Sequence, residues 1–452
     1  ALLVSQSATA QKYFQQKVDY SIRVQLDDVR HMLLAEQAVN YTNNSDSTLK
    51  IIWFHLWPNA YKNNETEFAK AELLSGSTKF QYASEKSRGY IDSLDFKVDG
   101  QSVKMEYHPD HQDICKIILN KPLNPGETIT ITTPFRVKIP SSAFSRLGHY
   151  QQQYQLCQWY PKPAVFDRKG WHPMPYLNQG EFYSEFGNFE VSITLPENYV
   201  VASSGELVAN PEEQARIEAN IEQTESWMKA GMVVSKDTLR SATKLKTVVY
   251  KLDNVHDFAW FTDKEYKIKR GSVTFERSGR TIDTEIYFTP KNAKAWANGV
   301  SYVNDAVKYY SRWVGDYPYK VCKALDGALS AGGGMEYPTI TIISPTSDTT
   351  QLDEVIAHEV GHNWFYGILA SNERDHPWMD EGTNSYYENR YMREKYPNHS
   401  LMATMLPDGL MKALGFDKFN MFYLQTVPYL LCARNAIDQP LNLHSHDYTS
   451  IN

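Results

Sequence analysis

Four residues in the second half of the chain have the types and spacing of a metal-dependent catalytic centre. His358, Glu359 and His362 form the pattern H-E-x-x-H, and Glu381 follows nineteen positions after His362. Four positions of a helix turn through about 400°, so the two histidines share one face about one turn apart. Two imidazoles at this spacing can bind one zinc ion, and Glu359 can then act as general base on a water at the metal.

Glu381 is the predicted third ligand of this zinc ion. A catalytic zinc usually takes three protein ligands and keeps a fourth position for water. Glu381 lies near the start of the helical run WMDEGTNSYYENRYMREKY, which follows a break in the chain at ASNERDHP. A helix–loop–helix hairpin can bring its carboxylate back beside the two histidines. The sequence therefore predicts one zinc ion bound by His358, His362 and Glu381. The alternative is a solvated helix face with a chance pair of histidines.

The helix that carries the pattern is expected to be buried, because TTQLDEVIAHEVGHNWFYGIL has an apolar stripe at helical spacing. The stripe consists of Leu352, Val355, Ile356, Val360 and Trp364. Polar groups on a buried helix need partners, and this requirement favours a functional role for the motif over a chance match.

The first half of the chain is predicted to be β-structure with one helical insert. Segments 20–27, 48–58, 128–139 and 189–196 alternate or run apolar, are rich in β-branched and aromatic residues, and are separated by turn signals. Two packed sheets are the natural way to bury such faces. The polar segment 210–231 is predicted as a helix, with Asn210 as its N-cap and Glu213 at the capping-box position.

Helical periodicity predominates from about Lys267 onward. Segment 290–315 repeats apolar residues at helical spacing, 319–328 and 337–345 are predicted as strands, and helices are expected from Leu352 to the end. We therefore predict a multidomain protein, with an N-terminal all-β sandwich domain over residues 11–267 and an α+β domain over residues 268–452.

Length and composition restrict the class of protein. At 452 residues and 52.0 kDa the chain is too long for one ordinary core. A content of 42% hydrophobic and 13% aromatic residues is typical of a globular protein. The net charge of -7 argues against a nucleic-acid partner. No apolar run approaches the ~18 residues of a transmembrane helix.

Two features bear on the cellular compartment. The four cysteines are scattered and form no C-x-x-C pair, so we expect buried thiols, with one or two disulfides as the alternative in an exported protein. Ala8 and Ala10 have the A-x-A spacing of a signal-peptide cleavage site, so residues 1–10 are predicted to be a signal-peptide remnant. An exported protein (periplasmic, cell-surface or extracellular) is therefore expected. The alternative is a cytoplasmic protein with a small-residue N-terminus.

These motifs resemble the aminopeptidase N and leukotriene hydrolase family of gluzincin zinc metallopeptidases. That family has H-E-x-x-H, eighteen residues and then Glu, and it carries G-x-M-E-N upstream of the zinc helix. This chain has SAGGGMEYPTI, with Gly333, Gly334, Met335 and Glu336 in register. HNWFYG and PWMDEG resemble the segments after the second and around the third ligand. The resemblance covers most of the chain and implies a saddle-like N-terminal β domain and a thermolysin-like catalytic domain, whose C-terminal end is expected to be truncated.

The resemblance implies a zinc-dependent aminopeptidase that acts on peptides with a free N-terminus. In relatives the glutamate of G-x-M-E-N binds the α-amino group, which implies this role for Glu336. A carboxylate ~4 Å from an ammonium gains on the order of 4 kcal/mol at an effective dielectric near ~20. Gly333 and Gly334 would let a peptide approach the backbone closely. Gln158, in QLCQWYP, resembles a second amine ligand of relatives; the alternative is a satisfied polar residue at a domain interface.

Two departures from the family pattern are visible. Tyr337 stands where the family has Asn, and we expect it to change the first side-chain pocket or the mouth of the cleft. The family's oxyanion-stabilising tyrosine has a Y-x-K-G-like context, which Tyr448 lacks, so this tyrosine is either Tyr448 or one beyond Asn452. Other functions remain open at this point: an endopeptidase or another hydrolase on the same zinc scaffold, or a non-catalytic binding homologue.

Overall fold

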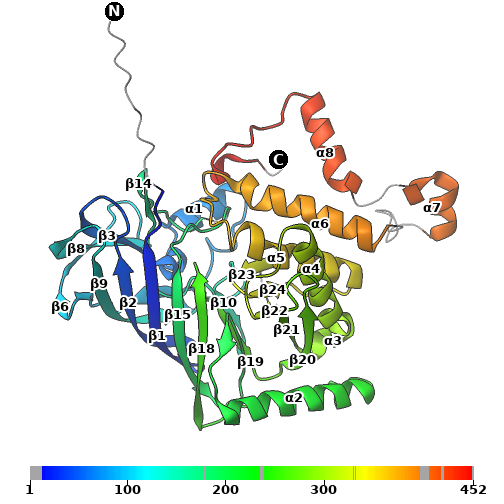
Figure 1. Ribbon diagram of the computed structural model, residues 1–452, viewed down its shortest axis with the longest axis horizontal. Coiled ribbons are helices and arrows are strands. Elements are labelled where there is room, and N and C mark those ends of the chain that lie inside the picture. The colour runs from blue at the N-terminus through cyan, green and yellow to red at the C-terminus, as the bar shows by residue number, and fades with distance from the viewer. Residues whose placement is uncertain are drawn as a thin grey trace, which may run out of the picture.

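The computed structural model describes residues 13–177, 179–234, 239–328, 330, 332–397, 407–418 and 422–449. The predicted signal-peptide remnant therefore lies outside the described residues. Figure 1 shows a β-rich first part in blue to green and a helix-rich second part in yellow to red. Within the described ranges, no helix is both long enough and apolar enough to cross a lipid bilayer.

A nine-stranded sheet is the largest element of the first part. Its central strand, β1, pairs in parallel with β15 and antiparallel with β2, and β2 continues to β9. Every second residue of β1 is buried, as the period of two in a strand requires when one face covers a core. The nine strands are β17 (Glu206–Leu207), β18 (Leu245–Val255), β15 (Gly187–Pro196), β1 (Lys17–Asp27), β2 (Met32–Thr42), β9 (Thr128–Lys138), β5 (Lys97–Val98), β6 (Gln101–Ser102) and, paired with β9, β4 (Tyr90–Asp92).

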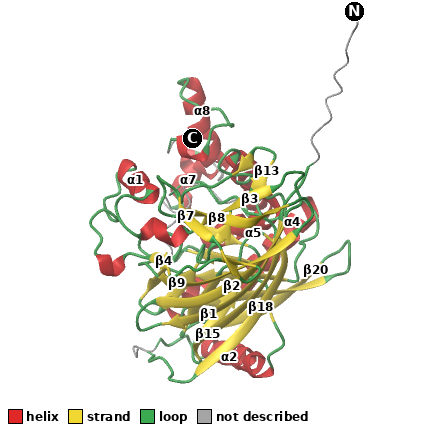
Figure 2. Cartoon of the chain, turned by 90° about the vertical axis from the view of Figure 1, so that its left-hand side faces the viewer, coloured by secondary structure: helices red, strands yellow, loops and turns green. Residues whose placement is uncertain are grey.

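Smaller sheets complete the first part. Figure 2 shows β3, β7 and β8 above the strands of the large sheet, which gives the two layers predicted from the alternating segments. One four-stranded sheet is β12 (Lys162–Pro163), β3 (Leu49–His55), β8 (Ile114–Leu123) and β7 (Lys104–Tyr107). The other sheets are β10 (Gly148–Tyr150), β11 (Gln153–Leu156), β19 (Trp260–Asp263) and β16 (Val200–Ser203), and the pair β13 (Phe166–Asp167) and β14 (Gly170–Trp171).

The predicted helical insert is confirmed as α2 (Pro211–Lys229). The Asn210 side chain caps it by accepting a hydrogen bond from the Glu213 amide at 3.1 Å. The Glu213 carboxylate does not complete a capping box and pairs instead with Lys246 at 2.6 Å. A second helix of this part, α1 (Glu67–Leu74), was not predicted.

The second part is an α+β unit, so the predicted order of an all-β part followed by an α+β part is confirmed. Its five-stranded sheet contains β20, β21 and β23, which the sequence analysis did not predict. The strands are β20 (Lys267–Thr274), β21 (Thr281–Phe288), β22 (Val321–Asp326), β24 (Ile340–Ile343) and β23 (Gly334–Tyr337), in this order, with β23 at the edge. β20 begins at Lys267, where we placed the domain boundary; the boundary itself stays a prediction.

The helices of the second part lie beside this sheet in Figure 1, and α7 and α8 extend away from it. A core that includes Ile286 of the sheet, Tyr310, Ile356 and Trp364 joins the sheet to the helices. The helices are α3 (Ala293–Trp296), α4 (Gly299–Trp313), α5 (Thr349–Phe365), α6 (Glu381–Lys395), α7 (Asp408–Leu414) and α8 (Phe422–Arg434).

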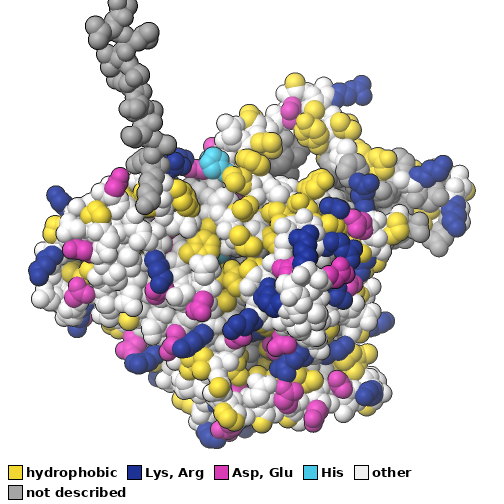
Figure 3. All heavy atoms as spheres, viewed as in Figure 1, with side chains coloured by type: hydrophobic (Ala, Val, Ile, Leu, Met, Phe, Trp, Pro, Cys, Tyr) yellow, Lys and Arg dark blue, Asp and Glu magenta, His cyan; other side chains and the backbone are white. Residues whose placement is uncertain are grey.

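The expectation of buried thiols is confirmed. All four cysteines are buried and unpaired, so the disulfide alternative is not adopted in this structure. Burial raises the pKa of Cys115 and Cys322 to about 12, so both are protonated thiols at neutral pH. On the face drawn in Figure 3, acidic and basic side chains are interspersed.

Candidate metal centre

Helix α5 carries the H-E-x-x-H pattern and is held firmly in the core. Asp348 caps it by accepting hydrogen bonds from the amides of Thr350 and Gln351 at 2.8 and 3.2 Å. The predicted apolar stripe is buried, except that Val355 is only partly buried. Gly361 marks the closest approach of neighbouring helices: a Cβ there would lie 2.1 Å from Asn384 of α6 and 2.5 Å from Tyr310 of α4.

The three predicted metal ligands come together on α5 and at the first residue of α6. His358 Nε2 lies 3.1 Å from His362 Nε2, and Glu381 Oε2 lies 3.3 and 3.8 Å from these two atoms. Ligand atoms about 2.0–2.2 Å from one tetrahedral zinc ion are about 3.3–3.5 Å from each other. The donor set and its spacing therefore fit zinc, and all three ligand atoms lie within 4.8 Å of one another.

The second ring nitrogen of each ligand histidine, Nδ1, is hydrogen-bonded to a carboxylate. His358 Nδ1 is 2.8 Å from Glu388 Oε2, and His362 Nδ1 is 2.6 Å from Asp380 Oδ1. Such partners fix the ring orientation and make the imidazole a stronger ligand. The sequence analysis missed both carboxylates. Asp380 directly precedes Glu381 in the sequence, and Glu388 follows it by two helical turns, so helical spacing could have found them.

The charges of the site also favour a cation. Burial alone would lower the pKa of His358, but hydrogen bonds to Glu381 and Glu388 raise it to about 10. Burial alone would raise the pKa of Glu381, but His362 and His358 lower it to about 2. The carboxylates thus stabilise positive charge on the imidazoles, and a metal ion that displaces those protons would meet the same favourable field.

Glu359 is buried beside the ligands and has a free carboxylate oxygen. Its Oε2 atom has no hydrogen-bond partner among the described residues, and burial raises its pKa to about 7, against the opposing effect of both histidines. A Cβ on Gly334 would lie 2.5 Å from Glu359 Oε1. Glycine at 334 therefore makes room for the predicted base, in addition to the substrate contact that we predicted for it.

The ligands open into a cavity of about 440 Å³. Arg146 and Glu181, from the first part of the chain, lie in its wall and form a buried ion pair through two hydrogen bonds. The sequence analysis missed both residues, since neither belongs to a motif. The remaining lining residues are Gly180, Gly333, Gly334, Met335, Glu336, Gln351, Glu354, Val355, His358, Glu359, His362, Glu381 and Glu388.

Glu336 lies on the edge strand β23 and lines the same cavity. It is 6% exposed, and its Oε1 atom has no partner among the residues described. Its carboxylate and the ligand atoms of His362 and Asp380 lie within 4.8 Å of one another. Burial raises the pKa of Glu336 well above its ordinary value, and the negative charge of the nearby Glu181 raises it further. The charged form of Glu336 is thus disfavoured until a cation enters the cavity and pairs with it, next to the metal ligands.

Comparison with known proteins gives the family. The model of the peptidase family M1 domain matches residues 307–423, a segment that contains α5 and Glu381. The segment that carries the zinc helix and Glu381 is therefore that of a peptidase family M1 domain, over about a quarter of the chain. This result confirms the resemblance to the aminopeptidase N and leukotriene hydrolase family that the motifs indicated.

Similar M1 sequences include two fungal enzymes. Leucine aminopeptidase 2 of Chaetomium globosum is 39% identical over 70 residues, which cover 15% of this chain and 12% of that protein. Leucine aminopeptidase 2-1 of Meyerozyma guilliermondii is 37% identical over 68 residues, which cover 15% of this chain and 11% of that protein. The matched segment thus spans only about an eighth of the length of these relatives.

Solved M1 structures share the fold over almost the whole chain. The M1 zinc metallopeptidase of Deinococcus radiodurans aligns with a TM-score of 0.55 at 14% identity, covering 98% of this chain and 80% of that one. A mutant of that peptidase bound to the substrate Tyr-Ser-Ala aligns with a TM-score of 0.56 at 13% identity, covering 97% and 80%. At this identity the likeness shows the fold: a β-sheet domain followed by an α+β catalytic domain.

Two residues singled out from the sequence, Gln158 and Tyr337, are not among the residues that line the cavity of the metal centre. Gln158 is buried, with φ of 48°, and its Nε2 donates to Asp257 at 3.2 Å; its role in amine binding stays a prediction. Tyr337 packs into a core with Cys157 and is not among the residues that line this cavity. Its expected effect on the first side-chain pocket or on the mouth of the cleft stays a prediction.

The position of the oxyanion tyrosine remains a prediction. Tyr448 donates to the Pro440 carbonyl at 2.9 Å and is not among the residues that line the cavity. No tyrosine of the described ranges belongs to that lining. Arg146 is the positively charged side chain that the described part of the wall contributes beside the histidines.

Proposed function

We propose that this chain carries zinc-dependent aminopeptidase activity, the hydrolysis of the N-terminal peptide bond of a peptide. The observation that supports it is the position of Glu336, whose carboxylate lies within 4.8 Å of a ring nitrogen of His362. The amino nitrogen and carbonyl carbon of one residue are only about 2.4 Å apart. An α-ammonium bound at Glu336 therefore leaves only the first carbonyl of the peptide within reach of the metal ligands.

The residues of the site divide the chemistry among them. Zinc bound by His358, His362 and Glu381 would polarise the scissile carbonyl and lower the pKa of water. Glu359 takes the proton of the attacking water and donates it to the leaving amine. Burial raises the pKa of Glu359 to about 7, and a zinc ion bound beside it would lower this pKa toward the ionised form that a base needs. Glu336 holds the amine, and burial strengthens this ion pair because water screens it less.

The activities of the relatives support this proposal. The two fungal relatives are leucine aminopeptidases, and the bacterial metallopeptidase was crystallised with Tyr-Ser-Ala, a peptide with a free N-terminus. No observation favours the alternative of an endopeptidase, because an interior peptide bond offers no ammonium to Glu336. The metal ligands and the base are all present, which disfavours a non-catalytic homologue.

The test compares aminoacyl chromogenic substrates with a free and an acetylated amine on Glu336→Ala and Glu336→Gln. We expect kcat/KM for the free amine to fall at least tenfold in both variants, since about 1.4 kcal/mol is tenfold. The acetylated substrate should show no comparable loss. Glu336→Gln keeps the shape of the side chain and isolates its charge. The proposal fails if Glu336→Ala hydrolyses unblocked substrates as well as the parent protein does.

We also propose that the protein is exported, on the basis of the A-x-A spacing of Ala8 and Ala10. N-terminal sequencing of the protein purified from its native cells should then give Gln11 as the first residue. Recovery of the protein in the cytoplasmic fraction with residues 1–10 still attached would contradict export.

A further inference from the structure

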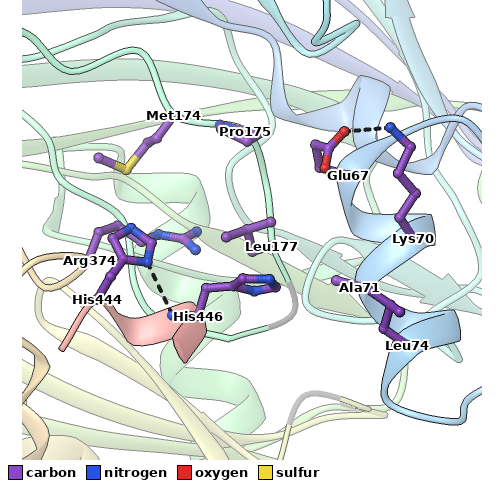
Figure 4. Close-up of a pocket in the computed structure, with 10 residues that line it drawn as sticks. All are labelled: Glu67, Lys70, Ala71, Leu74, Met174, Pro175, Leu177, Arg374, His444 and His446. Carbon is purple, nitrogen blue, oxygen red and sulfur yellow. Dashed lines mark hydrogen bonds and ion pairs between the residues drawn. The ribbon is translucent and has the colours of Figure 1, made fainter. Parts of the chain in front are cut away.

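A second cavity, behind one wall of the metal centre, contains a buried guanidinium. The cavity measures about 290 Å³ and lies between α1, the segment 174–177 and the segment 444–446 (Figure 4). Arg374 is only 2% exposed, and in Figure 4 its side chain extends from behind His444 toward Leu177. The apolar part of the wall consists of Ala71, Leu74, Met174, Pro175 and Leu177.

Only part of the Arg374 guanidinium is hydrogen-bonded. Its Nη1 donates to the Gln179 carbonyl at 2.7 Å, and its Cζ lies 5.7 Å from the centroid of the Phe182 ring. Its Nε and Nη2 atoms have no hydrogen-bond partner in the described part of the chain, nor does the hydroxyl of the adjacent Ser445. A buried charged donor without a partner is costly, so these atoms need an acceptor that the described residues do not supply.

The charge of Arg374 also lacks a direct counterion. The nearby Glu181 is engaged by Arg146 through two hydrogen bonds. Burial raises the pKa of the neighbouring Glu373 well above its ordinary value, which disfavours its charged form, and no ion pair joins it to Arg374 among the described residues. Burial lowers the pKa of Arg374 only to about 10, so the guanidinium remains positive. Of the other charged residues in the wall, Lys70 is paired with Glu67 at 2.6 Å.

The same edge of another arginine in this protein binds a carboxylate. Arg136 donates through Nε and Nη2 to the two carboxylate oxygens of Asp92 at 2.8 and 2.9 Å. This two-point geometry is the strongest and most specific pairing that an arginine makes with a carboxylate. Arg374 leaves the corresponding edge without a partner among the described residues. Both nitrogens are buried, so an incoming carboxylate must displace the side chains that cover them.

We propose that this cavity binds the carboxylate of a small organic acid with an apolar body. Nε and Nη2 of Arg374 would donate to the two carboxylate oxygens, and the apolar wall would enclose the body. The carboxylate belongs either to a free acid or to the C-terminus of a short peptide substrate. Gly180 stands between the two cavities: it lines the metal centre, and a Cβ on it would lie 3.5 Å from Arg374 Cδ.

Hexanoate is a suitable probe, and hexanamide is its neutral counterpart. Titration calorimetry on the zinc-loaded protein should detect hexanoate and give at least tenfold weaker binding of hexanamide. Arg374→Gln should weaken hexanoate binding at least tenfold, whereas Arg23→Gln, at a highly exposed arginine, should not change it. Because Arg374 is buried and its variant can fail to fold, Ala71→Phe provides a second test: it fills the cavity and leaves the guanidinium in place.

Kinetic measurements distinguish a free acid from the C-terminus of a peptide substrate. Of the experiments on this cavity, only these kinetic measurements rest on the proposed function. If the carboxylate is that of a substrate, hexanoate competes with a short peptide, and Ala71→Phe raises KM for the free-acid peptide but not for its C-terminal amide. If it is a free acid, hexanoate binds without competing. Absence of hexanoate binding at millimolar concentration overturns the proposal, as does equal binding of hexanamide or unchanged binding to both cavity variants. Calorimetry gives this answer even in a protein without peptidase activity.

Discussion

Replacement of Gly334 by alanine should greatly reduce the proposed peptidase activity while leaving the fold and the metal site intact. The new Cβ would lie 2.5 Å from Glu359 Oε1, whereas ordinary contact begins at 3.4 Å, so the carboxylate must move by about 0.9 Å. The backbone does not resist alanine here, because Gly334 is not among the glycines with positive φ. The obstacle is the Glu359 side chain, whose Cδ and Cγ would also lie 2.7 Å from the new Cβ, and no backbone atom is among the nearest contacts. We therefore expect the base to move and the strand to stay.

A displacement of about 1 Å in a catalytic group can cost roughly 100-fold in rate. We therefore expect kcat of Gly334→Ala to fall about 100-fold, equivalent to about 2.7 kcal/mol in the activation barrier. The melting temperature and the zinc content should stay close to those of the parent protein. The assay is the hydrolysis of an aminoacyl chromogenic substrate, with metal analysis of the same samples.

The matched control is Gly333→Ala, one residue earlier. Its Cβ would lie 3.7 Å from the nearest side-chain atom, on Val355, which is ordinary van der Waals contact. We expect nearly unchanged kcat in this variant. The reasoning is refuted if Gly334→Ala retains kcat within about threefold of the parent, or if both variants lose activity equally. Loss of zinc from Gly334→Ala alone would show that the effect reaches the metal ligands and not only the base.

Further predictions concern the base, the ligand histidines and pH. Glu359→Gln should retain zinc and lose roughly 100- to 10,000-fold in kcat; rates like those of the parent would exclude it as the base. Glu388→Gln and Asp380→Asn should each weaken zinc binding roughly 10- to 100-fold in a chelator competition; unchanged affinity would mean that these carboxylates do not support the ligands. Burial raises the pKa of Asp263 from 3.8 to about 7, so the folded protein holds a proton that the unfolded chain releases. Stability should therefore fall as pH rises from about 5 to about 7, by at most about 3 kcal/mol from this group. Denaturant unfolding of Asp263→Asn should show a flatter pH dependence; an unchanged slope would contradict this assignment.

Much of the secondary structure could be predicted from local sequence. Segments such as 128–139 and 189–196 alternate in the way that a half-buried strand requires, and both form strands. Asn210 caps the helical insert because its side chain is the nearest acceptor for a free amide of the first turn. β21 escaped prediction because six of its eight residues are buried, and a buried strand has no clear period of two.

The metal ligands could also be predicted from short stretches of the sequence. His358 and His362 lie one turn apart on one helix, so their shared direction follows from helix geometry. Glu381 required one further assumption, that α6 folds back against α5. Asp380 and Glu388 lie at short spacings from Glu381 and were within reach of the same reasoning.

The sequence by itself determined the zinc ligands, the base and the order of the two parts, because these depend on helix and strand periods over short stretches. Only the tertiary structure decided which residues from the first part reach the site. Arg146 and Glu181 precede the zinc helix by more than 150 positions, and no local period encodes their approach. The same holds for the free guanidinium edge of Arg374, because an unpaired donor is a property of everything packed around it.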